Sequence, residues 1–363
     1  MWMKGMTAYD LDERADQRDP GPGSLAGIRI VGLCGSIRPL YSGTDDYADM
    51  LYDALRSRGA DLRSVDTGSW GLTGVPGLLH AVRQEAPDVI LMQYPTDAFG
   101  RRLGTPVWSL LQRCAPLVVT LHEFTATHPL RRLAVGALLT RARRVVATAE
   151  REAQGLAHQY PWLQDRIRVV PIGANIPPRH WAPVAPQQVV YFGQVRPNKG
   201  IEDFLACRDR LLVNFPHVTF RILGSPVPQF AEYCRNVMAA AKQRNVEVTS
   251  GLSAAEIGDA LAAATVVVLP IPGGASFRRG SLLAAAVCGV PIVTTAGPDT
   301  PPDLAAALPL AHTPDEVVSM VARYLSDRAA RTQAHLQSEA LGRKVGWDGI
   351  ARLYCQILAE AAR

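Results

Sequence analysis

The sequence predicts an α/β protein with two doubly wound parallel sheets, that is, two Rossmann-like domains facing each other across a cleft. Short apolar runs alternate with segments of helical periodicity, which is typical of parallel sheets covered by helices on both faces. The alternation stops at a proline-rich stretch and then starts again. At 363 residues the chain also exceeds what one hydrophobic core usually supports, so two domains are expected.

The apolar runs predict the strands in order along the chain. In the first half the predicted strands are 28–34, 89–93, 117–121, 145–148 and 167–170, with helices such as 46–58 and 129–141 between them. In the second half they are 189–192, 219–223, 246–249, 265–269 and 291–294, with a helix from 199 to 211 after the first of them. Apolar residues at helical spacing predict a last amphipathic helix over 346–363.

Prolines mark the boundary between the domains, because they continue neither a helix nor a central strand. They cluster between Pro177 and Pro186, which places the linker near 177–187. We therefore predict a disordered leader over 1–26, a first domain over 27–182, a second domain over 183–337 and a terminal segment over 338–363.

Composition excludes several classes of protein. The cysteines are scattered without a CxxC pair, which predicts a reduced, cytoplasmic protein with no metal site. No apolar stretch reaches the roughly 18 to 20 residues that span a bilayer, and the first residues are too polar for a signal sequence. The net charge of +5 is too diffuse to predict nucleic-acid binding.

The segment 189–205 is the most informative one for function. An apolar strand is followed by Gly193, by two isolated cations, Arg196 and Lys199, and then by an amphipathic helix. Such a loop lies at the carboxyl edge of a parallel sheet, where open α/β folds bind ligands. Two cations beside a helix N-terminus suit a diphosphate, and the alternative is a pair of solvated loop cations.

A second cluster of cations precedes another predicted helix. Arg278 and Arg279 stand at its N-terminus, the positive end of the helix dipole, followed by Gly280 and Ser281. A bound anion would make this arrangement favourable, with Ser281 as a cap or as an oxygen-binding hydroxyl. Alternatively, the two arginines point into water or pair with acids elsewhere.

Several segments together resemble glycosyltransferases of the GT-B fold, specifically family 4, from about residue 28 to the C-terminus. These segments are VVTLHEF (118–124), VVATAERE (145–152), VVPIGANIP (169–177), GQVRPNKGIEDFL (193–205), FRILGSP (220–226), CGVPIVTT (288–295) and GWDGIARLY (346–354). The resemblance implies that the second domain binds a nucleoside diphosphate sugar and that the terminal helix crosses back to the first domain.

The resemblance also implies roles for individual residues. The donor diphosphate is assigned to Gly43, Arg196, Lys199, Arg279, Gly280 and Ser281. The nucleoside is assigned to Gly224, Thr249, Leu252 and Glu256. The family usually carries two glutamates separated by seven residues near the donor sugar and ribose. Ser276 and Ala284 occupy those positions here, with Arg278 between them, so the usual ribose contact is absent or supplied from elsewhere.

In the first domain, His122 matches the cleft histidine of the family, and Glu123 beside it is predicted to orient it or to contact the acceptor. A structural histidine at the sheet edge is the alternative. Asp45 and Asp46 either cap a helix or bind an acceptor hydroxyl or amine. Arginines around leucines in 130–144 form a basic amphipathic helix, for which a solvated face is favoured over contact with an anionic membrane.

Together these features predict a glycosyltransferase that moves a sugar from a nucleoside diphosphate donor to a small-molecule or carrier-linked acceptor. Retention of configuration is implied by the resemblance. No cofactor or metal is expected, because cations and a helix N-terminus would stabilise the departing diphosphate. The alternatives are an epimerase of the same fold and a non-catalytic nucleotide-sugar-binding protein. The sequence does not predict an oligomeric state.

Overall fold

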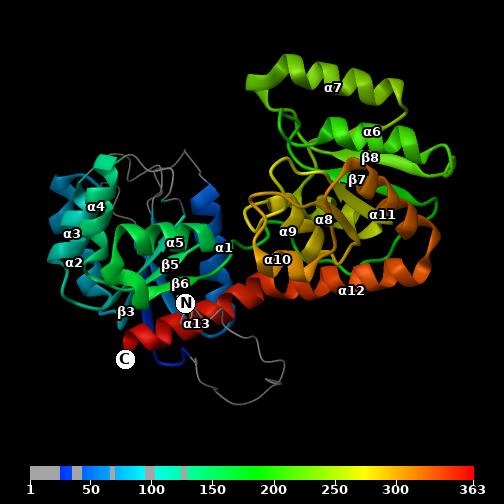
Figure 1. The fold of residues 1–363 in the computed structure, drawn as a ribbon. Coiled ribbons are helices and arrows are strands. Elements are labelled where there is room, and N and C mark those ends of the chain that lie inside the picture. Colours follow the sequence, from blue (N-terminus) through cyan, green and yellow to red (C-terminus); the bar gives the residue numbers. More distant parts are fainter. Residues whose placement is uncertain (1–24, 35–42, 66–69, 95–102, 123, 125–128) are drawn as a thin grey trace, which may run out of the picture. The chain divides into compact units, whose positions relative to one another are not determined.

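The computed structural model describes residues 25–34, 43–65, 70–94, 103–122, 124 and 129–363 (Figure 1). Residues 1–24 of the predicted leader lie outside this part of the chain. The prediction of disorder was wrong for residues 25 and 26, because Leu25 is buried and its carbonyl accepts a hydrogen bond from the N–H of Ile28 at 3.0 Å.

The chain divides into two compact units, residues 1–172 with 347–363 and residues 173–346. The second domain was predicted to begin at residue 183, ten residues after the second unit begins at Gly173. Residues 338–345 also belong to the second unit, as the last part of one of its helices. Gly342 packs closely there, because a Cβ on it would lie 2.3 Å from the carbonyl oxygen of Ala286.

The first unit is a six-stranded parallel sheet in the order β2-β1-β3-β4-β5-β6. Its elements are β1 (Arg29–Leu33), α1 (Gly43–Ser57), β2 (Asp61–Ser64), η1 (Leu72–Gly74), α2 (Val75–Gln84), β3 (Val89–Tyr94), α3 (Gly104–Leu111), β4 (Leu117–Leu121), α4 (Pro129–Leu139), β5 (Ala142–Ala147), α5 (Glu150–Gln159), η2 (Pro161–Arg166), β6 (Ile167–Val169) and α13 (Trp347–Ala362).

Alternate residues of these strands enter two separate cores, as expected for strands buried on both faces. In β3, Ile90 and Met92 pack with α2, α3, α4 and α5, whereas Val89 and Leu91 pack with α1 and α13. The terminal helix α13, drawn in red in Figure 1, is therefore part of the core of the first unit.

The second unit is also a six-stranded parallel sheet, in the order β12-β11-β10-β7-β8-β9. Its elements are β7 (Gln188–Phe192), α6 (Ile201–Leu211), β8 (Thr219–Leu223), η3 (Pro228–Phe230), α7 (Ala231–Gln243), β9 (Glu247–Thr249), α8 (Ala254–Ala263), β10 (Val266–Leu269), α9 (Gly280–Val287), β11 (Ile292–Thr295), α10 (Pro302–Ala307), β12 (Leu310–Ala311), α11 (Pro314–Ser326) and α12 (Arg328–Val345). The predicted class of two parallel sheets flanked by helices is confirmed.

The sequence prediction missed the two edge strands β2 and β12. Only Leu62 is buried in β2, and β12 has two residues, so neither strand produces an apolar run. An edge strand is covered less completely than a central one and needs less apolar sequence.

Candidate functional site

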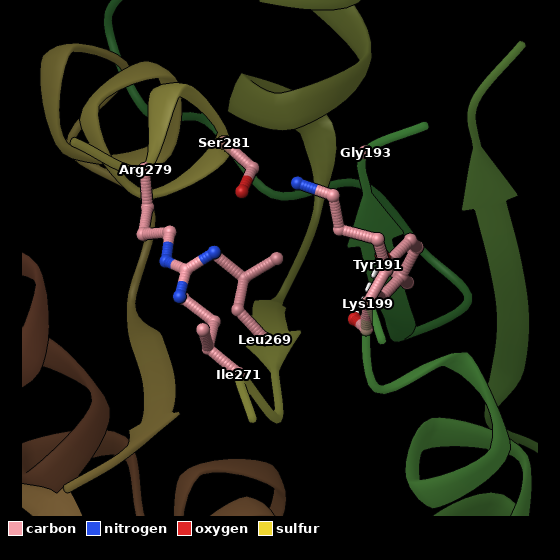
Figure 2. Close-up of a pocket in the computed structure, with 7 residues that line it drawn as sticks. All are labelled: Tyr191, Gly193, Lys199, Leu269, Ile271, Arg279 and Ser281. Atoms are coloured by element: carbon pink, nitrogen blue, oxygen red, sulfur yellow. Dashed lines mark hydrogen bonds between the residues drawn. The ribbon is translucent and has the colours of Figure 1, made fainter. Parts of the chain in front are cut away.

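A pocket lies in the second unit at the point where the order of its strands reverses. From β7 the chain proceeds outward through β8 and β9, and then returns to β10 on the other side of β7. Open α/β folds bind ligands at such a switch point, beyond the carboxyl ends of the strands. The pocket is lined by Tyr191, Gly193, Lys199, Leu269, Ile271, Arg279 and Ser281 (Figure 2). The loops after β7 and β10 thus bring together the two predicted clusters of cations.

Close packing of the backbone positions Lys199 in the loop between β7 and α6. The hydroxyl of Tyr191 donates a hydrogen bond to the carbonyl oxygen of Lys199 at 3.0 Å. The next residue, Gly200, has φ +74°, and a Cβ on it would lie 1.7 Å from the carbonyl oxygen of Pro270. Only glycine fits this position without displacing the β10 loop.

We expect Gly200→Ala to destabilise the protein and to move Lys199 away from the pocket. The left-handed conformation alone costs a non-glycine residue about 1 to 2 kcal/mol, and the clash with Pro270 adds to that. Urea unfolding measures the change. Gly77→Ala is the matched control, because Gly77 lies in α2 with open space around it and alanine should stabilise that helix by roughly 0.5 to 1 kcal/mol. Equal stability of Gly200→Ala and the wild type would contradict this account.

The cations of the pocket repel one another. Burial lowers the pKa of Lys199, and the positive charges of Arg196 and Arg279 lower it further. Arg196 is not one of the lining residues, and its Nε donates to Oε1 of Gln194 at 3.2 Å. An anion bound between these cations would be attracted to each of them and would offset their mutual repulsion. Figure 2 shows the amine of Lys199 and the guanidinium of Arg279 pointing into the same space.

Arg279 connects the pocket to the N-terminus of α9. It is the N-cap residue of this helix, and no side chain caps the helix there. Its guanidinium lies 3.9 Å from the carboxylate of Asp299 and donates to the carbonyl of Pro272 at 3.4 Å, while its buried Nε has no partner among the described residues. The first N–H groups of α9, at Gly280 and Ser281, have no acceptor within their own helix.

The two positions where the family usually carries glutamates lie in different environments in this structure. Ser276 is half-buried in the loop before α9, and its carbonyl accepts a hydrogen bond from the N–H of Arg279 at 3.0 Å. Ala284 is completely buried within α9. Alanine therefore serves the packing of this helix, and its side chain is not exposed to a ligand. Arg278 is exposed beside the N-terminus of α9.

The residues predicted for the nucleoside lie at the ends of β8 and β9. Gly224 follows β8, and a Cβ on it would lie 2.0 Å from the carbonyl oxygen of Gly193, so the loops after β7 and β8 pack tightly. The hydroxyl of Thr249 donates to Glu247 at 2.8 Å and accepts from Arg221 at 3.0 Å. Leu252 is half-buried in the following loop.

Glu256 has a structural partner within its own helix. It completes a capping box in which its carboxylate accepts hydrogen bonds from the N–H and the hydroxyl of Ser253 at 2.8 and 2.7 Å. Those hydrogen bonds lower the pKa of Glu256. Sequence reasoning did not consider this capping role, although the S-x-x-E pattern indicates it.

In the first unit, the predicted site residue His122 follows β4. Its Nε2 lies 3.0 Å from Oε1 of Gln93 in β3, and the ring of Tyr47 packs edge-on against it, with 4.8 Å between ring centroids. The N–H of His122 donates to the carbonyl of Tyr94 at 3.0 Å. Burial lowers the pKa of His122 to about 4, so the imidazole is neutral at pH 7. Glu123 lies outside the described residues.

The acceptor candidates Asp45 and Asp46 lie in the first turn of α1, which begins at Gly43. Asp45 is buried and accepts a hydrogen bond from the thiol of Cys34 at 3.2 Å. Asp46 is exposed. The two acids thus face different environments, and only Asp46 is accessible to solvent.

The basic residues of 130–144 are partly engaged within the first unit. Arg131 and Arg132 lie over the rings of Tyr94 and Phe124, and Arg144 forms an ion pair with Glu360 at 3.2 Å. Across the described residues, no helix is long and apolar enough to cross a membrane. No group of His, Cys, Asp and Glu side chains suited to a metal ion occurs in that same part of the chain.

Comparisons with known proteins identify the family. The model of group 1 glycosyl transferases matches residues 186–327, and the model of glycosyltransferase family 4 matches residues 37–176. The chain belongs to these glycosyltransferases. The predicted resemblance and enzyme class are therefore confirmed. No curated protein sequence matches the chain significantly.

Solved structures share the GT-B fold of this glycosyltransferase. HepE from Anabaena, in complex with UDP and glucose, has a TM-score of 0.62 at 18% identity, covering 92% of this chain and 99% of HepE. A glycosyltransferase from Rickettsia africae has a TM-score of 0.67 at 9% identity, covering 93% and 99%. WaaG, which is involved in lipopolysaccharide biosynthesis, has a TM-score of 0.57 at 12% identity, covering 91% and 99%.

Sequence reasoning missed two residues that support the candidate site residues of the glycosyltransferase. Tyr191 and Gln93 lie inside apolar strands, and the sequence of such strands predicts core residues, not site residues. The available signal was polarity at a strand end, since Gln93 interrupts the run VILMQY. The contacts of these residues with Lys199 and His122 depend on which loops and strands are neighbours in space.

Proposed function

We propose that this glycosyltransferase transfers a sugar from a nucleoside diphosphate donor to a small-molecule or carrier-linked acceptor, with retention of configuration and without a metal ion. The observation that carries the proposal is the group of three cations, Lys199, Arg196 and Arg279, gathered at the switch point beside the N-terminus of α9. The Anabaena relative HepE, solved with UDP-glucose, supports a nucleotide-sugar donor.

The leaving group is the part of the reaction that this pocket suits best. When the glycosidic bond to the diphosphate breaks, negative charge increases on the phosphate oxygens. Lys199 and Arg279 donate hydrogen bonds to that charge, and the N–H groups of Gly280 and Ser281 point at it from the helix N-terminus. Because the cations are already placed, they need no reorganisation at the moment of transfer.

The same arrangement supports transfer without a metal. A divalent cation in related chemistry neutralises the diphosphate, and here the side-chain charges of Lys199, Arg196 and Arg279 supply that neutralisation. Transfer should continue in EDTA. Complete loss of activity in EDTA, with recovery on adding Mg²⁺ or Mn²⁺, would overturn this part of the proposal.

Two measurements test the function as a whole. A thermal-shift screen with UDP-, GDP-, dTDP- and ADP-sugars should show stabilisation by one donor and by its nucleoside diphosphate. Incubation of that donor with an acceptor panel should then release the nucleoside diphosphate and form a glycoside of unchanged anomeric configuration by NMR. Donor binding without transfer to any acceptor, or isomerised donor without an acceptor, would contradict the proposal.

We expect His122→Ala to lower the turnover number more than the affinity for the donor. His122 belongs to the first unit, whereas the diphosphate cluster belongs to the second, so its loss leaves the charge contacts intact. Steady-state kinetics gives the turnover number, and calorimetric titration with the nucleoside diphosphate gives the affinity. Unchanged turnover in a folded variant would mean that His122 is structural.

A further inference from the structure

A buried glutamine holds the imidazole of His122 from the inside of the first unit. Gln93 has no exposed surface, and its Oε1 lies 3.0 Å from Nε2 of His122. With the Gln93 amide oriented as in the structure, its carbonyl oxygen accepts the hydrogen bond and Nε2 of His122 is the protonated nitrogen, while the amide nitrogen of Gln93 is buried without a partner among the described residues. His122 itself is partly exposed, and its Nδ1 has no hydrogen-bond partner within the described part of the chain.

The backbone and the ring of His122 are fixed as well. Its N–H donates to the carbonyl of Tyr94, and its carbonyl accepts from the hydroxyl of Thr148 at 3.4 Å. Tyr47 packs edge-on against the ring, and the hydroxyl of Tyr47 lies 3.2 Å from that of Tyr354 on α13. The ring therefore has little freedom to turn and exchange the positions of its two nitrogens.

We propose that Gln93 is a positioning residue that fixes His122 as the neutral Nε2–H tautomer and so presents Nδ1 as a hydrogen-bond acceptor to a hydroxyl of the substrate. This inference rests on the proposed function, since it needs a substrate at His122. It assigns His122 an accepting role, not that of a proton donor. The low pKa that burial gives His122 agrees with that role, because an imidazolium would have no accepting nitrogen.

Gln93→Glu tests the role of the amide without a large change of shape. The described residues that contact the imidazole are Gln93 from β3 and Tyr47 from α1, and neither is charged at neutral pH. A carboxylate at position 93 favours the charged imidazolium and raises the pKa of His122. Below that raised pKa Nδ1 carries a proton, so transfer is lost as the pH falls and returns as the pH rises.

The first measurement needs no substrate. Imidazole ¹⁵N–¹H correlation spectra of the whole protein at pH 7, with His122→Ala to assign the signal, should show Nε2 protonated and Nδ1 bare. An Nδ1–H tautomer or an imidazolium would overturn the proposal. Since the spectra are recorded without a donor, they remain decisive if the proposed glycosyl transfer fails, a failure that the donor screen reveals separately.

The second measurement is kinetic. Gln93→Leu should lower the turnover number by about twofold to tenfold, the range for one lost neutral hydrogen bond, while affinity for the nucleoside diphosphate stays unchanged. Gln93→Glu should add an acid limb to the pH profile of turnover that the wild type lacks, and this limb should vanish when His122→Ala is added. A Gln93→Glu profile equal to that of the wild type, or a limb that persists without His122, would overturn the proposal.

Discussion

Lys199→Ala should reduce kcat/KM for transfer by roughly 10- to 150-fold while the protein stays folded. One hydrogen bond to a charged group contributes about 1.5 to 3 kcal/mol, which corresponds to that range of rates. The amine of Lys199 lines the pocket at the switch point and faces the guanidinium of Arg279 (Figure 2). Its loss should weaken binding of the nucleoside diphosphate product as well, which calorimetric titration measures.

The free protein should not lose stability from this substitution. Burial and the charges of Arg196 and Arg279 disfavour the protonated amine of Lys199, so its removal relieves repulsion.

Arg196→Ala should also reduce transfer at least tenfold, since a charged hydrogen bond of about 1.5 kcal/mol is the minimum expected. Lys242→Ala is the matched control, because Lys242 is exposed on α7, and its kinetics should equal those of the wild type. Wild-type transfer by both Lys199→Ala and Arg196→Ala would exclude a diphosphate contact at these residues.

The sequence allowed the two clusters of cations to be predicted because each follows a central strand and precedes a helix. Arg196 and Lys199 follow β7, and Arg279 precedes α9. The sequence does not state that β7 and β10 are neighbours, because an apolar strand pairs as well with any other apolar strand. Their adjacency follows from the completed sheet, and it is what places Lys199 opposite Arg279.

Other features of the site depend on close approach between segments that are distant in the chain. Gly200 is preceded by a lysine and followed by a helix, so a local pattern predicts a turn, but its contact with Pro270 requires the packed β10 loop. Likewise, Gln93 in β3 and His122 after β4 meet because the two strands pair in parallel register, with Tyr94 beside Leu121. Residues of this kind are found from the fold and not from sequence periodicity.

Removal of residues 346–363 should unfold the first unit and leave the second unit folded. The sequence predicted a terminal helix with an apolar stripe, and the structure places that stripe in the core formed with α1 and the sheet. Ile350, Tyr354, Ile357 and Leu358 are all completely buried there. Loss of one such side chain typically costs about 2 to 5 kcal/mol, so loss of all four, roughly 8 to 20 kcal/mol, is at least as large as the roughly 5 to 15 kcal/mol that stabilises a domain.

Calorimetry of a chain ending at Val345 should therefore lack the unfolding transition of the first unit and retain that of the second, which has its own sheet and pocket. Stabilisation by the nucleoside diphosphate should persist, because Lys199 and Arg279 remain, while transfer is abolished.

Arg352→Ala is the control for the surface of α13. The side chain of Arg352 is exposed and pairs only with Asp348 among the described residues, so the free energy of unfolding should change by less than about 0.5 kcal/mol. A truncated chain with normal transfer and both transitions would mean that α13 merely covers a core already stable without it. The hydrogen bond between the hydroxyls of Tyr354 and Thr120 of β4, at 2.8 Å inside that core, argues against such a peripheral role.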